Sequence, residues 1–267
     1  MQQASKMVLR AVAGLLLGAG TAPAAMAQSL LGSAQQEQLA GWLGEGPLAL
    51  TAIYTKAAGD TSRDFHLAAD GKGRTFSVME ASNGSGQTWL VGGYNPQSWN
   101  ASGNYNMTPD DRDRTAFIFN LTSGQYHRQT PKTYALDTVG AYQTFNHIDA
   151  GPTFGIGADL GVSADLTTNG VSYRYSYIDP VSGTFGTSLL DGQPYGNSPN
   201  VTFGALQVFS ISAVPEPSAY VLMLLGLVSL AGLRRCKRRV GGVRNKGVVR
   251  CRGTDNGASD WSSVTLT

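Results

Sequence analysis

Between residues 28 and 214, apolar residues recur in short alternating runs, and Gly, Asn and Ser separate these runs. This pattern is typical of strands joined by tight turns. The predicted strands are residues 48–55, 74–81, 87–94, 115–121, 133–137, 142–145, 171–178 and 201–212. The turn sequence SNGSG joins the second and third of them into a hairpin. Residues 95–114 are expected to form a long polar loop.

Helical spacing of apolar residues is convincing in two places. At residues 33–44 three apolar side chains share one face, and Ser33 can cap the first turn. The second helix begins after Thr61, which is followed three residues later by Asp64 as in a capping box, and Gly71 lies where left-handed backbone ends a helix. The predicted fold class is therefore mainly β: a two-sheet antiparallel β-sandwich with a few short peripheral helices.

The N-terminal segment differs from the rest of the chain. Residues 1–27 combine a basic start, the apolar stretch AVAGLLLGAG, and small residues Ala25 and Ala27 at positions −3 and −1. This order is typical of a secretory signal peptide, here cleaved by signal peptidase before Gln28. The chain is therefore expected to be exported.

A second apolar segment lies near the C-terminus. Pro215, Glu216 and Pro217 precede fifteen uncharged residues at 219–233, and five basic residues follow up to Arg239. A helix that spans a bilayer needs about 20 apolar residues, so this one is short. It also lacks the polar stripe of a buried helix in a soluble domain. Membrane insertion is the better interpretation, with the basic cluster on the cytoplasmic side.

The order of motif, short apolar helix and arginine-rich end over residues 214–239 resembles the PEP-CTERM sorting signal of Gram-negative bacteria. The resemblance implies processing by an exosortase, an inner-membrane intermediate with only transient membrane attachment, and a final place at the cell surface or outside the cell. The surface form is expected to end near residues 215–217. Residues 240–267 continue past the usual end of such signals, and their composition predicts disorder. They are either a cytoplasmic stub or the product of a frameshift or read-through.

The amino-acid composition of the exported region differs from that of the whole chain. Residues 28–214 contain nine Lys and Arg against fifteen Asp and Glu, a net charge of −6, and both cysteines, Cys236 and Cys251, lie beyond the sorting motif. An acidic domain without a basic run excludes nucleic acid as a partner. The lack of cysteine excludes a thiol nucleophile and a cysteine-based metal site.

Four stretches inside the exported region carry a second resemblance. They are DFHLAADGKGRTFSVMEA, VGGYNPQSW, TAFIFNL and GPTFGIGADLGVS, and their order and spacing resemble the TLDc domain from about residue 30 to residue 212. The predicted domains are 1–27, the signal peptide; 28–213, the TLDc-like domain; 214–239, the sorting signal; and 240–267, the tail. The motif residues, for which structural roles are expected, are Phe65, His66, Asp70, Gly71, Gly73, Gly92, Gly93, Trp99, Gly151, Phe154, Gly155, Gly157 and Asp159.

The TLDc resemblance implies a two-sheet β-sandwich and no accepted catalytic site. Eukaryotic members are associated with resistance to oxidative stress and with the vacuolar proton pump, which an exported bacterial protein does not meet. This chain departs from the family at Ala69, where many members have Cys, at Arg74, a common Pro, and at Ala158, a frequent His. Only the fold and the notion of a binding module transfer.

Candidate sites in the exported region are few. His66 and Asp70 are four residues apart, as an acid–base pair on a helix would be, but no Ser or Cys nucleophile accompanies them, and a packing role for His66 is favoured. The glycines of GIGADLG lack the helix and βαβ unit of a dinucleotide loop, and PDDRDR and DLTTNG lack calcium-ligand spacing. His127 and His147 stand alone. No metal or cofactor is expected.

The sequence thus favours a non-enzymatic TLDc-like binding or protective module at the cell surface, with exopolysaccharide of a biofilm or another surface component as its partner. Two alternatives stay open. A surface-polymer hydrolase would use His66, Asp70 and Glu80. A lectin-like polysaccharide binder would use exposed aromatic residues at Trp89, Tyr94 and Trp99.

Overall fold

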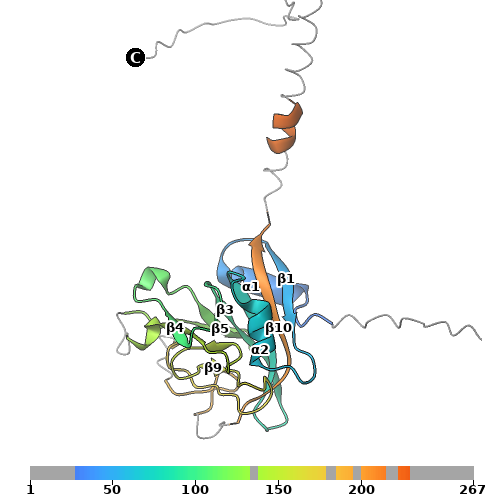
Figure 1. Ribbon diagram of the computed structural model, residues 1–267. Helices are drawn as coiled ribbons and strands as arrows, with labels where there is room; N and C mark the ends of the chain where they lie inside the picture. Colours follow the sequence, from blue (N-terminus) through green and yellow to red (C-terminus); the bar gives the residue numbers. More distant parts are fainter. Residues whose placement is uncertain (1–27, 133–137, 179–184, 195–199, 215–221, 229–267) are drawn as a thin grey trace, which may run out of the picture. The chain divides into compact units, whose positions relative to one another are not determined.

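Two antiparallel sheets form the compact part of the chain that ends at Val214 (Figure 1). The computed structural model describes residues 28–132, 138–178, 185–194, 200–214 and 222–228. The six-stranded sheet has the order β1 (Leu48–Thr55), β10 (Thr202–Ala213), β2 (Thr75–Ser82), β3 (Thr88–Asn95), β5 (Phe117–Asn120) and β6 (Gln125–Arg128). The four-stranded sheet has the order β4 (Asn104–Met107), β7 (Tyr142–Asn146), β8 (Thr153–Phe154) and β9 (Leu160–Gly161). The predicted mainly β fold with two antiparallel sheets is confirmed.

Both faces of the six-stranded sheet are covered. Its inner face packs against the four-stranded sheet and α2 (Ser62–Ala69), in a cluster that includes Phe65, Met79 and Phe154. Its outer face is covered by α1 (Ser33–Leu43), through a second cluster of buried apolar residues that includes Leu39 and Phe76. Apolar area removed from water on both sides of one sheet is the main source of stability for such a layered fold.

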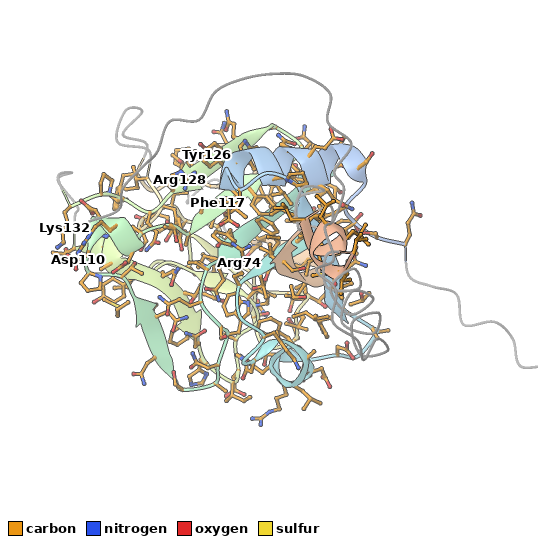
Figure 2. The ribbon with its side chains drawn as sticks, turned by 90° about the horizontal axis from the view of Figure 1, so that it is seen from above. Arg74, Asp110, Phe117, Tyr126, Arg128 and Lys132 are labelled. Carbon is orange, nitrogen blue, oxygen red and sulfur yellow. The ribbon has the colours of Figure 1, made fainter. Side chains whose placement is uncertain are left out.

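Aromatic contacts hold α1 on its sheet. Figure 2 shows this helix beside Phe117, Tyr126 and Arg128. The ring of Trp42 stacks on Tyr126 with 5.1 Å between centroids and meets Phe117 edge-on at 6.5 Å. The Arg128 guanidinium lies over the rings of Phe117 and Tyr126 and donates a hydrogen bond of 2.9 Å to the Trp42 carbonyl oxygen. These contacts join the end of α1 to the edge strand β6.

The hydrophobic centre between the two sheets is aromatic. Trp99 is fully buried, and its ring lies 5.4 Å from Phe65 and 5.4 Å from Phe154, edge-on to each. Its indole N–H donates a hydrogen bond of 2.9 Å to Thr75 Oγ1, so its one polar atom is satisfied. A Cβ at Gly93 of β3 would overlap with the Phe154 ring. The ring therefore packs directly on the backbone of the opposite sheet.

The two predicted helices are present, with one correction at a cap. α2 has the predicted capping box: the Thr61 N–H donates a hydrogen bond of 2.8 Å to Asp64 Oδ2. α1, however, is not capped by Ser33, which is already its first helical residue. Gly32 is the N-cap, because its carbonyl oxygen accepts the first helical hydrogen bond, from the Gln36 N–H. No side-chain hydrogen bond caps this helix.

The strand predicted at residues 171–178 is wrong. Only Val171 forms a bridge there, with Gly161. The alternation of aromatic and polar residues is real, but the main-chain N–H groups of Tyr175 and Tyr177 donate to the carboxylate of Asp159 rather than to a neighbouring strand. A buried side chain has taken the place of a strand partner.

The predicted loop 95–114 is also wrong in part, because it contains β4 and the 3-10 turn η1 (Asp111–Asp113). β4 pairs with β7, and its Asn-rich sequence shows no strand pattern of its own, so tertiary pairing decides its conformation. β6 was not predicted either, since its sequence QYHR is polar and faces solvent. A second 3-10 turn, η2 (Val139–Ala141), leads into β7.

Several predictions fall outside the described residues. These are the signal peptide at 1–27, the extended piece at 133–137, and the tail at 240–267. Within the predicted C-terminal helix only residues 222–228 are described, and they are helical. In the described part of the chain, no helix has the length and apolar character needed to cross a membrane.

Because neither sheet uses cysteine and the core between them is apolar and aromatic, we expect residues 28–214 to fold alone as a monomer without metal or reducing agent. Thermal unfolding of this fragment should be a single transition at the same temperature with and without a chelator or dithiothreitol. A melting temperature that falls on adding the chelator would contradict this expectation.

Candidate functional site

His66 joins α2 to the turn after β7. Its side chain is buried; Nδ1 lies 2.7 Å from Asp70 Oδ1, and Nε2 lies 2.9 Å from the carbonyl oxygen of His147 and 3.1 Å from that of Ala150. Each ring nitrogen thus faces oxygen atoms that accept hydrogen bonds. The imidazole is held as a bridge between a helix and a turn, and Phe65 packs beside it at 4.8 Å.

Asp159 organises the loops in the second half of the domain. Its side chain is fully buried, and Oδ2 accepts hydrogen bonds from the N–H groups of Tyr175 and Tyr177. Oδ1 has no partner among the described residues and occupies the space that a Cβ at Gly155 would need. Gly155 also has a φ of 77°, a left-handed conformation that favours glycine. Burial raises the pKa of the Asp159 carboxyl to about 7, although these main-chain N–H groups favour the ionised form.

The other residues of the TLDc-like motifs lie at close approaches or at left-handed turns. Gly71 and Gly73 have φ values of 70° and 74°. A Cβ at Gly92 would overlap with the Ser77 carbonyl oxygen, and one at Gly151 with Leu166. Gly157 lies against Tyr173 and Tyr175. None of these positions presents a reactive group.

The residues of the two alternative functions do not assemble into a site. Glu80 lies on the α1 side of the six-stranded sheet, beside Leu90 and Thr88, whereas His66 and Asp70 face the turn after β7 on the other side. The structure therefore does not bring the three hydrolase candidates together. The three lectin candidates, Trp89, Tyr94 and Trp99, are all buried, so the predicted exposed platform is wrong.

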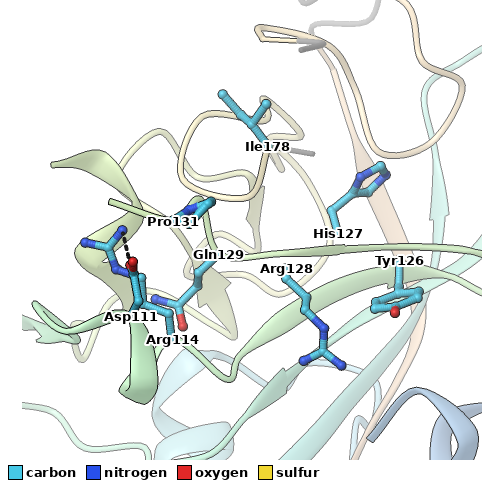
Figure 3. A pocket seen from close by; sticks show the side chains of 8 residues that line it. All are labelled: Asp111, Arg114, Tyr126, His127, Arg128, Gln129, Pro131 and Ile178. Atoms are coloured by element: carbon cyan, nitrogen blue, oxygen red, sulfur yellow. Dashed lines mark ion pairs between the residues drawn. The ribbon is translucent and has the colours of Figure 1, made fainter. Parts of the chain in front are cut away.

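A cavity of about 490 Å³ lies beside β6 (Figure 3). Its lining residues are Asp111, Arg114, Tyr126, His127, Arg128, Gln129, Pro131 and Ile178. The buried Arg114 donates hydrogen bonds to the carbonyl oxygens of Thr108 and Thr130, and its Nη1 lies 3.4 Å from Asp111. Arg128 is bound to α1, as described above. The two guanidinium groups are thus engaged with the protein itself.

No grouping of three or more His, Cys, Asp or Glu side chains with metal-ligand geometry occurs in the described ranges. In the DLTTNG segment the Asp165 carboxylate turns onto its own loop, where Oδ1 accepts hydrogen bonds of 2.9 Å from the N–H groups of Thr167 and Thr168. The hydrogen bond from the Thr168 hydroxyl has the largest effect on the pKa of the Asp165 carboxyl, which it lowers. The bonds from the two N–H groups lower the pKa further. The loop uses the carboxylate to close itself.

A row of partly exposed rings lies on one face of β4 and β7. We define the aromatic row as Tyr142, Tyr105, Phe145 and His147. Successive ring centroids are 5.0, 4.8 and 5.6 Å apart, and each of the four residues is half-buried. Met107, 45% exposed, extends the row as the cross-strand partner of Tyr142. This feature was missed because Tyr105 fell in the predicted loop.

A β-bulge aligns the row. Asn106 pairs with Thr144 but Met107 pairs with Tyr142, so Gln143 is the extra residue. Side chains alternate along a regular strand, and the bulge lets both Tyr142 and Phe145 point outward. The Gln143 carbonyl oxygen accepts hydrogen bonds of 3.0 Å from the Gly155 N–H and 2.6 Å from the Tyr177 hydroxyl, which fix the bulge.

The motif residues therefore support the row from behind. Asp159 binds the Tyr177 N–H, and the Tyr177 hydroxyl in turn holds the bulge at Gln143. His66 binds the carbonyl oxygen of His147, the last ring of the row. Two hydrogen-bond networks, one at Gln143 and one at His147, thus hold the backbone of the aromatic row in place.

Comparison with known proteins identifies one segment. Residues 213–239 match the family model of the PEP-CTERM protein-sorting motif, which confirms this part of the sequence interpretation. The motif implies export that depends on an exosortase, and a destination at the cell surface. No curated protein shows significant similarity to the chain. The resemblance of residues 30–212 to the TLDc domain stays a prediction.

Replacing His66 tests its bridging role. We expect His66→Ala to lower the free energy of unfolding by about 1–3 kcal/mol, because two main-chain carbonyl oxygens and the Asp70 carboxylate lose their partner. Urea denaturation followed by tryptophan fluorescence measures this. Leu67→Ala is the matched control, because Leu67 is in the same helix and is 87% exposed, and it should change little. Equal stability of the two variants would contradict the bridge.

Asp159 makes stability depend on pH. Its pKa of about 7 lies above the value of 3.8 expected in the unfolded chain, so the folded state retains a proton that the unfolded state has released. Its contribution is therefore fully present below about pH 4 and is lost as pH rises to 7, by about 1.4 kcal/mol per pH unit. Asp159→Asn can still accept the N–H groups of Tyr175 and Tyr177 but does not titrate. Urea titrations from pH 4 to 8 should show a flatter profile for this variant; identical slopes would refute the assignment.

Proposed function

We propose that residues 28–213 form a non-catalytic binding module that the exosortase route places at the cell surface, where it attaches to the extracellular matrix. The observation that carries this proposal is the contrast between two sets of side chains. The groups suited to acid–base chemistry, His66 and Asp159, are buried and bound to the main chain. The half-exposed side chains of the aromatic row have no comparable structural task.

The sorting motif supports a surface role. It directly follows β10, whose last residue Ala213 pairs with Leu48 of β1. The sorting motif is therefore contiguous in sequence with the last strand of the six-stranded sheet. The resemblance to the TLDc domain, whose family has no accepted catalytic site, agrees with binding rather than turnover.

Co-sedimentation tests this function with the natural product of export. The processed protein, recovered from the surface of an exosortase-containing host, is mixed with washed extracellular matrix of that host and centrifuged. We expect the protein in the pellet and no new reducing ends in the supernatant, because a binding module holds its polymer without cleaving it. Protein left entirely in the supernatant would refute attachment to the matrix.

The hydrolase alternative has a separate outcome in the same experiment. Release of reducing ends by the wild type, abolished in a His66→Ala protein that is still folded, would assign catalysis to His66 and overturn the non-catalytic role. The Leu67→Ala protein, altered at an exposed site on the same helix, serves as the control for nonspecific effects of substitution.

A further inference from the structure

The aromatic row offers ring faces and free hydroxyl groups together. Tyr54 and Tyr177 hydroxyls are hydrogen-bonded to Asp60 and to the Gln143 carbonyl oxygen. The hydroxyls of Tyr105 and Tyr142, in contrast, have no hydrogen-bond partner among the described residues. A tyrosine ring with a free hydroxyl presents an apolar face beside a polar tip. Its natural partner has apolar patches and hydroxyl groups in alternation.

The strands that carry the row are neutral. β4 has the sequence NYNM and β7 has the sequence YQTFN, so neither strand contains a charged residue. The surrounding exported region has a net charge of −6. A polyanion would be repelled by this domain and would find no cation on the two strands. The chemistry of the face therefore suits an uncharged ligand.

The row is held ready before any ligand arrives. The bulge at Gln143 is bound by Tyr177, and the turn at His147 is bound by His66. His147 is itself oriented, since its Nδ1 accepts a hydrogen bond of 3.2 Å from the Asp149 N–H, and its ring is nearly parallel to that of Phe145, at 11°. Rings fixed in this way lose little conformational entropy on binding.

From these observations we propose that the aromatic row binds a neutral polysaccharide, whose sugar rings stack on Tyr105 and Phe145, which are inclined to each other by 39°. The phenol hydroxyls of Tyr105 and of Tyr142, whose ring meets Tyr105 edge-on, bond to sugar hydroxyls. Pyranose rings have apolar C–H faces and hydroxyl edges, which match the two parts of each tyrosine. Several neighbouring rings fit several sugar residues of a polymer better than one monosaccharide. This inference rests on the proposed function and names the ligand and the surface that binds it.

The test uses the processed protein and the polysaccharide of the host's matrix. The matrix is freed of protein and separated by anion exchange into neutral and acidic fractions, and each is cast into native gels. Wild-type protein should be retarded in the neutral fraction and not in the acidic one. Tyr105→Ala and Tyr142→Ala should each weaken retardation about tenfold, the loss expected for one aromatic contact of roughly 1.4 kcal/mol.

Matched variants separate binding from folding. Phe185→Ala removes a 44% exposed aromatic ring outside the row and should bind as the wild type does. Tyr105→Phe keeps the ring and removes only the hydroxyl, and it should bind more tightly than Tyr105→Ala. Each variant must melt within a few degrees of wild type. If Tyr105→Ala is unstable, the loss in Tyr142→Ala and the intermediate binding of Tyr105→Phe decide the result.

Two sets of results would contradict this proposal, one for the ligand and one for the site. Retardation only by the acidic fraction, or sedimentation only with matrix that still contains protein, would overturn the neutral ligand. Binding to the neutral fraction that survives in both row variants would overturn the site. Either result leaves the proposed function standing, because that function fails only if wild-type protein does not sediment with whole matrix.

Discussion

The contact between the Phe154 ring and the backbone of Gly93 determines how the two sheets meet. Phe154 belongs to β8 in the four-stranded sheet and Gly93 to β3 in the six-stranded sheet, and a side chain at position 93 would overlap with the ring. Trp99 and Tyr177 then pack edge-on against the same ring. Close packing leaves no room for a second arrangement at this point.

A chain of hydrogen bonds connects this buried contact to the partly exposed face of β7. The chain after Phe154 turns left-handed at Gly155, whose lack of a Cβ makes space for the Asp159 carboxylate. Asp159 fixes Tyr177, and Tyr177 fixes the β-bulge at Gln143. A bulge reverses the direction of the side chains beyond it. One buried acid thus controls which rings face solvent on β7.

The sequence predicted those features that depend on local pattern. The capping box at Thr61 and the hairpin of β2 and β3 follow from residues close together in the chain, and both are present. The predictions for residues 104–107 and for residues 171–178 were wrong for the same reason, because partners far away in sequence set the conformation of both segments. The partner is β7 for the first segment and Asp159 for the second. The local conformational propensity of a segment contains no information about such distant partners.

The candidate site illustrates the same limit. The sequence drew attention to Trp89, Tyr94 and Trp99 because large aromatic residues near a turn suggest a platform, but all three are used for packing. The aromatic row could not be found by inspection, since it needs residue 105 from one strand and residues 142 and 145 from another, brought into line by an unpredicted bulge. Exposure of an aromatic side chain is a property of tertiary structure.

The position of β10 connects the fold to its export. This strand lies between β1 and β2 and is the last one in the sequence, with Phe203, Leu206 and Val208 in the core. A chain that emerges N-terminus first therefore cannot complete its six-stranded sheet until residue 213 has passed the membrane. The match to the sorting motif begins at that residue. The sorting motif thus adjoins, in sequence, the strand that fills the gap between β1 and β2, whose open edges would otherwise be free to pair with other chains.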